Sequence, residues 1–246
     1  AMVGYIAYGC GGRKTGVEER QLLGARFLAV SLAAARRPMG PVALHQARRA
    51  AGRLAELGVR RAVFPQEFPY MSIFARRGIC PVETLPLRQA LAVPLVRRRL
   101  AELGIAPTQA VAAVSAARLS REVAETVTAL ALCYRYVMLH VPSGGGELAR
   151  SLRREYGVSL LLDPGAEQLD RADALLLFAP RGDLTQTNPV FYALYPGGET
   201  GAGRLPLPLP EGLGEAVEPD CEGEQLTAAL WQMGVITKEA ILSEIP

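Results

Sequence analysis

YVMLHV (Tyr136–Val141), PSGGG (Pro142–Gly146), ELARSLRREYG (Glu147–Gly157) and VSLLLD (Val158–Asp163) follow one another just past the middle of the chain. The first and last segments are short apolar runs with no helical spacing, which is typical of strands buried on both faces of a parallel sheet. The third segment has its apolar residues at helical spacing. This order predicts a strand, a glycine turn, a helix and a second buried strand over Val158–Leu162.

Local signals mark the boundaries of this unit. Pro142 ends the first strand, and Ser143 can cap the helix because its hydroxyl can accept a hydrogen bond from a nearby orphan N–H. Gly157 is a natural helix stop. The predicted apolar face holds Leu148, Ala149, Leu152 and Tyr156, with Arg150, Arg153 and Arg154 on the other side. A strand, a crossover helix and a parallel strand form one right-handed βαβ unit.

The alternation of strands and helices continues on both sides of this unit. Upstream, Ala110–Val114 predicts a strand, and Ser120 can cap the helix that follows it. Downstream, a short helix near Leu169–Asp173 leads into a strand at Ala174–Phe178. We therefore expect an α/β fold, with a mainly parallel, Rossmann-like sheet flanked by helices in three α/β/α layers. A Pro/Gly-rich C-terminal extension and two short terminal helices complete it.

The segments ELARSLRREYGV (from Glu147) and LDRADALLLFAP (from Leu169) resemble strands two to four of Rossmann-type NAD(P) domains. Shikimate dehydrogenase-like and glutamyl-tRNA reductase-like enzymes contain such domains, and the resemblance covers residues 110–180. It implies a G-x-G-x-x-G turn for the pyrophosphate, but SAARLSRE (Ser115–Glu122) contains no glycine. The second strand ends at His140-Val141, not in an acidic residue for a ribose. The sequence therefore leaves the cofactor unknown.

The N-terminal part continues the α/β pattern. Val3–Tyr8 and Arg60–Phe64 predict strands, and Val42–Leu57 and Leu85–Leu103 predict helices, the second kinked or split by Pro94. Four portions are expected: an N-terminal α/β portion over 1–105, a Rossmann-like portion over 106–182, an acidic Pro/Gly-rich extended segment over 183–224, and two short helices over 225–246. Alternatively, all four form one compact domain.

Composition limits the class of protein. Half of the 246 residues are hydrophobic, yet no apolar run reaches the roughly 18 residues needed to span a bilayer. We therefore expect a cytoplasmic protein with no membrane partner. The four cysteines are far apart, which favours free thiols. With only two histidines, the sequence predicts no His-rich metal site.

Charge is distributed unevenly. Residues 1–123 hold 19 basic and 7 acidic residues, whereas residues 124–246 hold 8 and 17. Such asymmetry can mark a nucleic-acid face. However, the arginines fall mostly on polar helix sides and lack the interleaved aromatic residues of single-strand binders. Nucleic acid is therefore a disfavoured partner, and the opposite charges could instead attract each other within the chain or between subunits.

Candidate ligand-binding residues follow the predicted strands. In open parallel sheets, ligands bind beyond the carboxyl ends of the strands. Glycines that open a helix direct N–H groups and the positive dipole end toward an anion, although a serine-capped tight turn would also explain them. His140 could act there as an acid or base. The candidates are Ser143, Gly144, Gly145, Gly146, His140 and Arg181, together with Gly11 and Gly12 of the loop GCGGRKTG, which lacks P-loop spacing.

Three functions remain open from the sequence. The first is binding of a small anionic or phosphorylated ligand at the carboxyl rim of the sheet, with or without catalysis. The second is a non-catalytic interaction or regulatory role, as a homo-oligomer or with a protein partner. The third and weakest is nucleic-acid binding through the basic N-terminal half.

Overall fold

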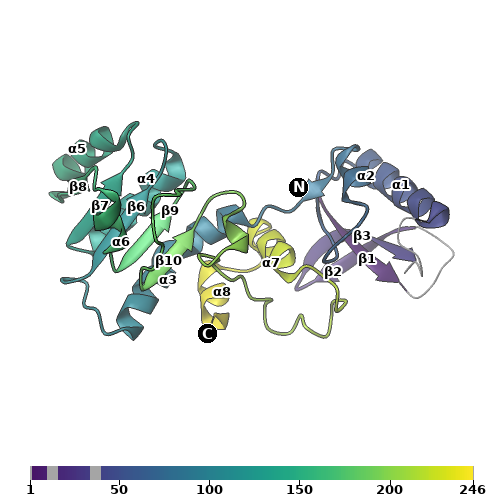
Figure 1. The fold of residues 1–246 in the computed structure, drawn as a ribbon. Helices are drawn as coiled ribbons and strands as arrows, with labels where there is room; N and C mark the ends of the chain where they lie inside the picture. Colours follow the sequence, from purple (N-terminus) through teal and green to yellow (C-terminus); the bar gives the residue numbers. More distant parts are fainter. Residues whose placement is uncertain (1, 10–15, 34–39, 246) are drawn as a thin grey trace. The chain divides into compact units, whose positions relative to one another are not determined.

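The computed structural model describes residues 2–9, 16–33 and 40–245. The chain forms two compact units: the first combines residues 1–84 with 207–246, and the second is residues 85–206. Each unit is built around its own five-stranded sheet (Figure 1). The first boundary lies at residue 84 because α3 (Leu85–Glu102) packs on strands of the second unit. The expected N-terminal portion, in contrast, extends to residue 105.

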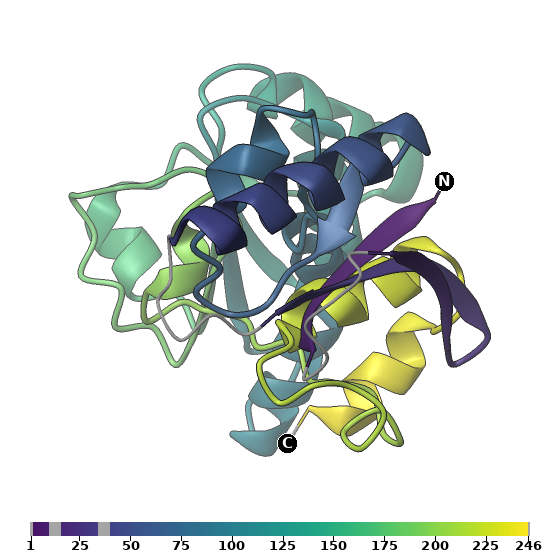
Figure 2. The ribbon, with the colours of Figure 1, turned by 90° about the vertical axis from the view of Figure 1, so that its right-hand side faces the viewer.

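The first unit has the strand order β2-β3-β1-β4-β5. Its elements are β1 (Val3–Gly9), β2 (Val17–Leu22), β3 (Ala25–Ala33), α1 (Pro41–Glu56), β4 (Arg61–Val63), α2 (Met71–Ala75), β5 (Cys80–Pro81), α7 (Gly223–Gln232) and α8 (Lys238–Glu244). All neighbours are parallel except β2, which forms an antiparallel hairpin with β3. Ile6 packs toward α1, and α7 lies on the other side of β1 (Figure 2).

The C-terminal segment is joined to this sheet by a partly buried polar cluster. The Tyr5 hydroxyl donates to Glu218 Oε2 at 2.7 Å, and Arg20 Nη1 donates to Glu218 Oε1 at 2.7 Å. The Arg20 guanidinium also lies over the Tyr5 ring, 4.5 Å from its centroid. Nearby, the backbone N–H of Gln66 donates to the Asp220 carbonyl at 2.7 Å. We call Tyr5, Arg20 and Glu218 the Glu218 clamp.

The second unit has the order β10-β9-β6-β7-β8, with every strand parallel to its neighbours. Its remaining elements are β6 (Val111–Ser115), α4 (Arg121–Cys133), β7 (Tyr136–His140), α5 (Gly145–Tyr156), β8 (Leu161–Leu162), α6 (Ala166–Asp170), β9 (Ala174–Leu177), β10 (Val190–Ala193) and a 3-10 turn at Gly198–Thr200. Helices α3, α4 and α5 pack together, and α6 covers the other face through Leu169. The expected parallel, three-layer α/β fold is confirmed.

Several local expectations were wrong. The strand predicted over Val158–Leu162 is only the two-residue β8, and its side chains are 49% and 40% exposed because it forms the sheet edge. Tyr156, predicted on the inner helix face, is exposed. Two further strands lie where no strand was predicted: β2 follows the first glycine loop, and β10 lies in the aromatic segment after Asn188. Helix α3 continues through Pro94 without a break.

The described residues bear on two further expectations. No helix in this part of the chain combines the length and apolar character that crossing a bilayer requires. Within the same residues, no three His, Cys, Asp or Glu side chains gather in a way that could hold a metal ion. Cys80, Cys133 and Cys221 are free thiols, and Cys10 lies outside the described residues.

Candidate functional site

The strand order places a topological switch point in the second unit. From β6, the chain proceeds to β7 and β8 on one side, and later to β9 and β10 on the other. In open parallel sheets, such a switch point at the carboxyl ends of the strands is where ligands bind. Ser115 ends β6, His140 ends the neighbouring β7, and Arg181 follows β9. The predicted candidates His140 and Arg181 therefore lie at the carboxyl ends of neighbouring strands, together with Ser115.

The loop after β6 is bound to the loop after β7. The backbone N–H of Ala116 donates to the His140 carbonyl at 3.0 Å, and that of Leu119 donates to the Ser143 carbonyl at 2.9 Å. Ser120 caps α4, as predicted, by accepting from the Val123 N–H at 3.3 Å. In a dinucleotide-binding turn, such N–H groups face the pyrophosphate. Because they are used internally here, this loop does not fit a dinucleotide, and we assign no chemistry through NAD(P).

The three glycines of PSGGG have different surroundings. Gly144 has φ +92°, and a Cβ there would lie 2.8 Å from Leu119 Cβ. A Cβ at Gly145 would lie 3.1 Å from Val141 Cβ, whereas one at Gly146 would meet no atom within 4 Å. Backbone conformation and packing therefore explain the first two glycines without a ligand. Gly146 alone faces open space.

The first turn of α5 begins differently from the prediction. Gly144, not Ser143, is the N-cap, and its backbone is in the left-handed region. No side chain caps the helix, because glycine has none. The backbone N–H groups of Gly146 and Glu147 donate to no described residue. They lie at the positive end of the helix dipole, where anions are stabilised. The carboxylate of Glu147 offsets part of that positive potential.

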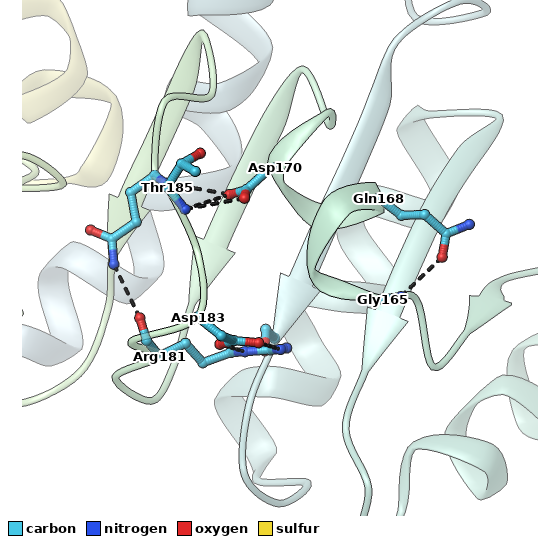
Figure 3. A network of polar contacts seen from close by, with 8 residues as sticks. Gly165, Gln168, Asp170, Arg181, Asp183 and Thr185 are labelled. Atoms are coloured by element: carbon cyan, nitrogen blue, oxygen red, sulfur yellow. Dashed lines mark hydrogen bonds and ion pairs between the residues drawn. The ribbon is translucent and has the colours of Figure 1, made fainter.

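Arg181 connects the loop after β9 to the end of β6. Its Nε donates to Asp183 Oδ1 at 2.9 Å, and its Nη1 reaches Ser115 Oγ at 3.4 Å (Figure 3). The Arg181 side chain is 18% exposed, whereas that of Asp183 is 53% exposed. The guanidinium holds the pKa of the Asp183 carboxyl below its usual range, and charge on His140 acts in the same direction.

His140 has one nitrogen without a partner. Its Nδ1 is buried and forms no hydrogen bond with any described residue. An imidazole nitrogen can donate a proton when it carries the hydrogen and can accept one when it does not, so Nδ1 could exchange a proton with a bound molecule. The arrangement can therefore supply a cation, an imidazole and free backbone N–H groups along one edge of the sheet.

Residues that the sequence did not single out fix the loop after β9. Asp170 accepts from the backbone N–H of Thr185 at 2.9 and 3.1 Å (Figure 3). The Asn188 amide donates to the carbonyls of Leu169 at 2.8 Å and Ala172 at 2.8 Å. These contacts join the loop to α6, so Arg181 is held by a rigid segment. No local sequence pattern marks them, because each pair is about 15 to 19 residues apart.

The other predicted candidates, Gly11 and Gly12, lie outside the described residues. The structure therefore brings together His140, Ser143, the glycines of PSGGG and Arg181 within one unit. Ser115, Asp170 and Asp183 complete the surroundings of Arg181.

Comparison with protein-family models found no match, and comparison with curated proteins found none either. Among solved structures, the catalytic subunit of M. jannaschii aspartate transcarbamoylase is 12% identical, covers 98% of this chain and 86% of its own, and has a TM-score of 0.37. Shikimate dehydrogenase from Aquifex aeolicus is 13% identical, with coverages of 99% and 97% and a TM-score of 0.32. D-lactate dehydrogenase with NAD+ from Lactobacillus jensenii is 10% identical, with coverages of 59% and 48% and a TM-score of 0.31.

Proposed function

We propose that the second unit binds a small anionic ligand, a phosphorylated or carboxylated metabolite, at the carboxyl rim of its parallel sheet. The observation that carries this proposal is the convergence of Ser115, His140 and Arg181 at the ends of neighbouring parallel strands. The unbonded N–H groups at the start of α5 lie after one of those strands. Parallel sheets bind ligands at this edge.

Each group has a distinct role in this proposal. The N–H groups of Gly146 and Glu147 donate to the anion, and Arg181 supplies the opposite charge. Arg181 already bonds Asp183, but about half of that side chain is exposed, so solvent screens the ion pair and weakens it. An anion can therefore replace Asp183 at low cost. His140 exchanges a proton with the ligand or orients it, and we assign no reaction beyond binding.

The proposal is tested most directly by a substitution that places a negative charge at position 146. A side chain there enters open space, and an acidic residue at a helix N-terminus keeps or raises helix stability. We expect Gly146→Asp to fold normally yet repel an anion from the α5 N-terminus. Gly146→Asn, which has nearly the same shape without the charge, is the matched control.

The measurement is thermal unfolding with inorganic phosphate, phosphate monoesters and mono- and dicarboxylates. At a concentration of 100 Kd, a ligand stabilises the unit that binds it by about 2.7 kcal/mol, which raises Tm by several degrees. The wild type and Gly146→Asn should show this rise with at least one anion, and Gly146→Asp should lose it. No rise with any anion, or an equal rise in Gly146→Asp, would contradict the proposal.

A further inference from the structure

A second concave site lies at the opposite edge of the second unit. Helix α4 starts beside the carboxyl rim and runs back across the sheet, so its last residues lie at the other edge. There, the C-terminal halves of α3 and α4 and the loop after α3 enclose a cavity of about 620 Å³. Ligand cavities in proteins typically measure roughly 300–1,000 Å³. The cavity is therefore large enough for a small organic molecule.

The walls of this cavity are apolar, and its charged residues are all basic. Leu100, Ile105 and Leu132 line it, and Leu132 is 57% exposed although it is a leucine on a packed helix. Arg97 and Arg98 line it as well, and no acidic side chain does so among the described residues. An apolar wall beside positive charge is complementary to a molecule with an apolar body and an anionic head.

Tyr134 adds a phenol group to the lining of the cavity. The residue lines the cavity, yet only 5% of its surface is exposed, so its ring is held by packing. Burial raises the pKa of the Tyr134 phenol, and the positive charge of Arg97 opposes that effect. Arg97 and Tyr134 both line the cavity. A neutral hydroxyl and a cation can together bind one carboxylate or sulfonate group.

Arg97 is not needed to bind the last carbonyls of α3. Basic residues often bind the last carbonyls of a helix. In α3, however, the Leu100 carbonyl accepts from the Ile105 N–H at 2.9 Å, and the Arg99 carbonyl accepts from the Leu103 N–H at 3.0 Å. Within the described chain, Arg97 forms no ion pair, whereas the next two arginines both reach Glu102. Its charge is available to a ligand.

We propose that this cavity binds a small amphipathic anion, with a carboxylate or sulfonate head at Arg97 and Tyr134 and a ring or short alkyl body against the leucines. The site is separate from the anion site at the carboxyl rim, and it does not depend on that proposal.

The probe is 8-anilinonaphthalene-1-sulfonate, whose fluorescence rises when its rings leave water for an apolar site. We expect the intact chain to bind it, with decanoate as a competitor and decyltrimethylammonium as a non-competitor. Arg97→Gln should weaken binding about tenfold, because the anionic head loses a charged hydrogen-bond donor. Ala101→Phe should weaken it further, because Ala101 is an exposed helix residue that lines the cavity and a ring there fills it.

Controls separate this site from other binding and from unfolding. Arg121→Gln removes an exposed arginine at the other end of α4 and should leave probe affinity unchanged. Gly146→Asp should also leave it unchanged, because that glycine lies at the other rim. Unaltered far-UV circular dichroism and Tm verify folding of each variant. Equal affinity in Arg97→Gln, Ala101→Phe and wild type, or equal competition by the cationic and anionic detergents, would overturn the proposal.

Discussion

Three consecutive glycines show how much a single position depends on its surroundings. Gly144 has a left-handed backbone against Leu119, whereas Gly146 is helical with open space around its Cα. The sequence presents them as equivalent. Their roles differ because Leu119, about 25 residues earlier, packs where a side chain at Gly144 would lie.

Alanine substitutions at these two glycines should have opposite effects. Gly144→Ala should destabilise the second unit by about 1–2 kcal/mol from the left-handed backbone alone, and more because Leu119 must move. Gly146→Ala should stabilise it by roughly 0.5–1 kcal/mol, because alanine loses less backbone entropy in a helix. Urea unfolding measures both. Equal midpoints for the two variants would show that the turn at Gly144 is not constrained.

Helix caps were predictable where the capping bond is local. Ser120 caps α4, as predicted, and Thr237 caps α8; each side chain accepts from the backbone N–H three residues on. The prediction that Ser143 caps α5 was wrong, because Gly144 is the N-cap. The loop at Ser143 is bound to a distant segment, since the Ser143 carbonyl accepts from the Leu119 N–H. Sequence patterns report contacts within a few residues and miss those between loops.

At the scale of helices and strands, the type of element was more predictable than its position in the sheet. The strands near Val111, Val137 and Leu161 are parallel neighbours, which confirms the central expectation. However, an apolar run does not reveal whether its strand is central or at an edge, so the exposure of Leu161 and Leu162 could not be foreseen. Strand β2 was missed because its mostly polar side chains reflect an exposed edge.

The connection from β9 to β10 depends on one buried amide. Asn188, 8% exposed, donates to three carbonyls around the end of α6. Asn188→Ala should cost about 1–3 kcal/mol, because those carbonyls lose their donor in a buried place. The neighbouring Thr187 is exposed, and Thr187→Ala should be within about 0.5 kcal/mol of wild type. Chemical denaturation of both variants tests this, and equal stabilities would contradict it.

At the scale of the whole molecule, the first unit consists of both ends of the chain. Residues 207–246 return to the sheet of residues 1–84, and the Glu218 clamp is one of the contacts that join them. Composition indicated a change of character after Pro180 but could not show which sheet the last segment covers. That information lies in pairs such as Tyr5 and Glu218, which are 213 residues apart.

Acid should weaken the Glu218 clamp. Burial alone would raise the pKa of Glu218, but hydrogen bonds from Tyr5 and Arg20 outweigh it and hold the pKa below its usual value of 4.5. A lowered carboxyl pKa stabilises the folded state above pH 4.5, and this contribution is lost as the pH falls through the folded-state pKa. We expect at most about 1 kcal/mol, because solvent reaches the pair.

The check compares wild type with Glu218→Gln in urea from pH 7 to pH 3. The difference in free energy of unfolding of the first unit should be constant at neutral pH and shrink below pH 4.5, where the wild-type carboxylate gains its proton. A difference that grows on acidification would mean that Glu218 is destabilising when charged.

The return of the C-terminal segment has a consequence for biosynthesis. A ribosome releases the chain from its N-terminus, so residues 85–206 emerge from the exit tunnel before residues 207–246 do. The unit that is translated first is therefore finished last, while the interior unit can fold as soon as it leaves the exit tunnel. Until residues 207–246 have emerged, the face of the sheet around Tyr5 is uncovered, and a chaperone could protect it during this interval.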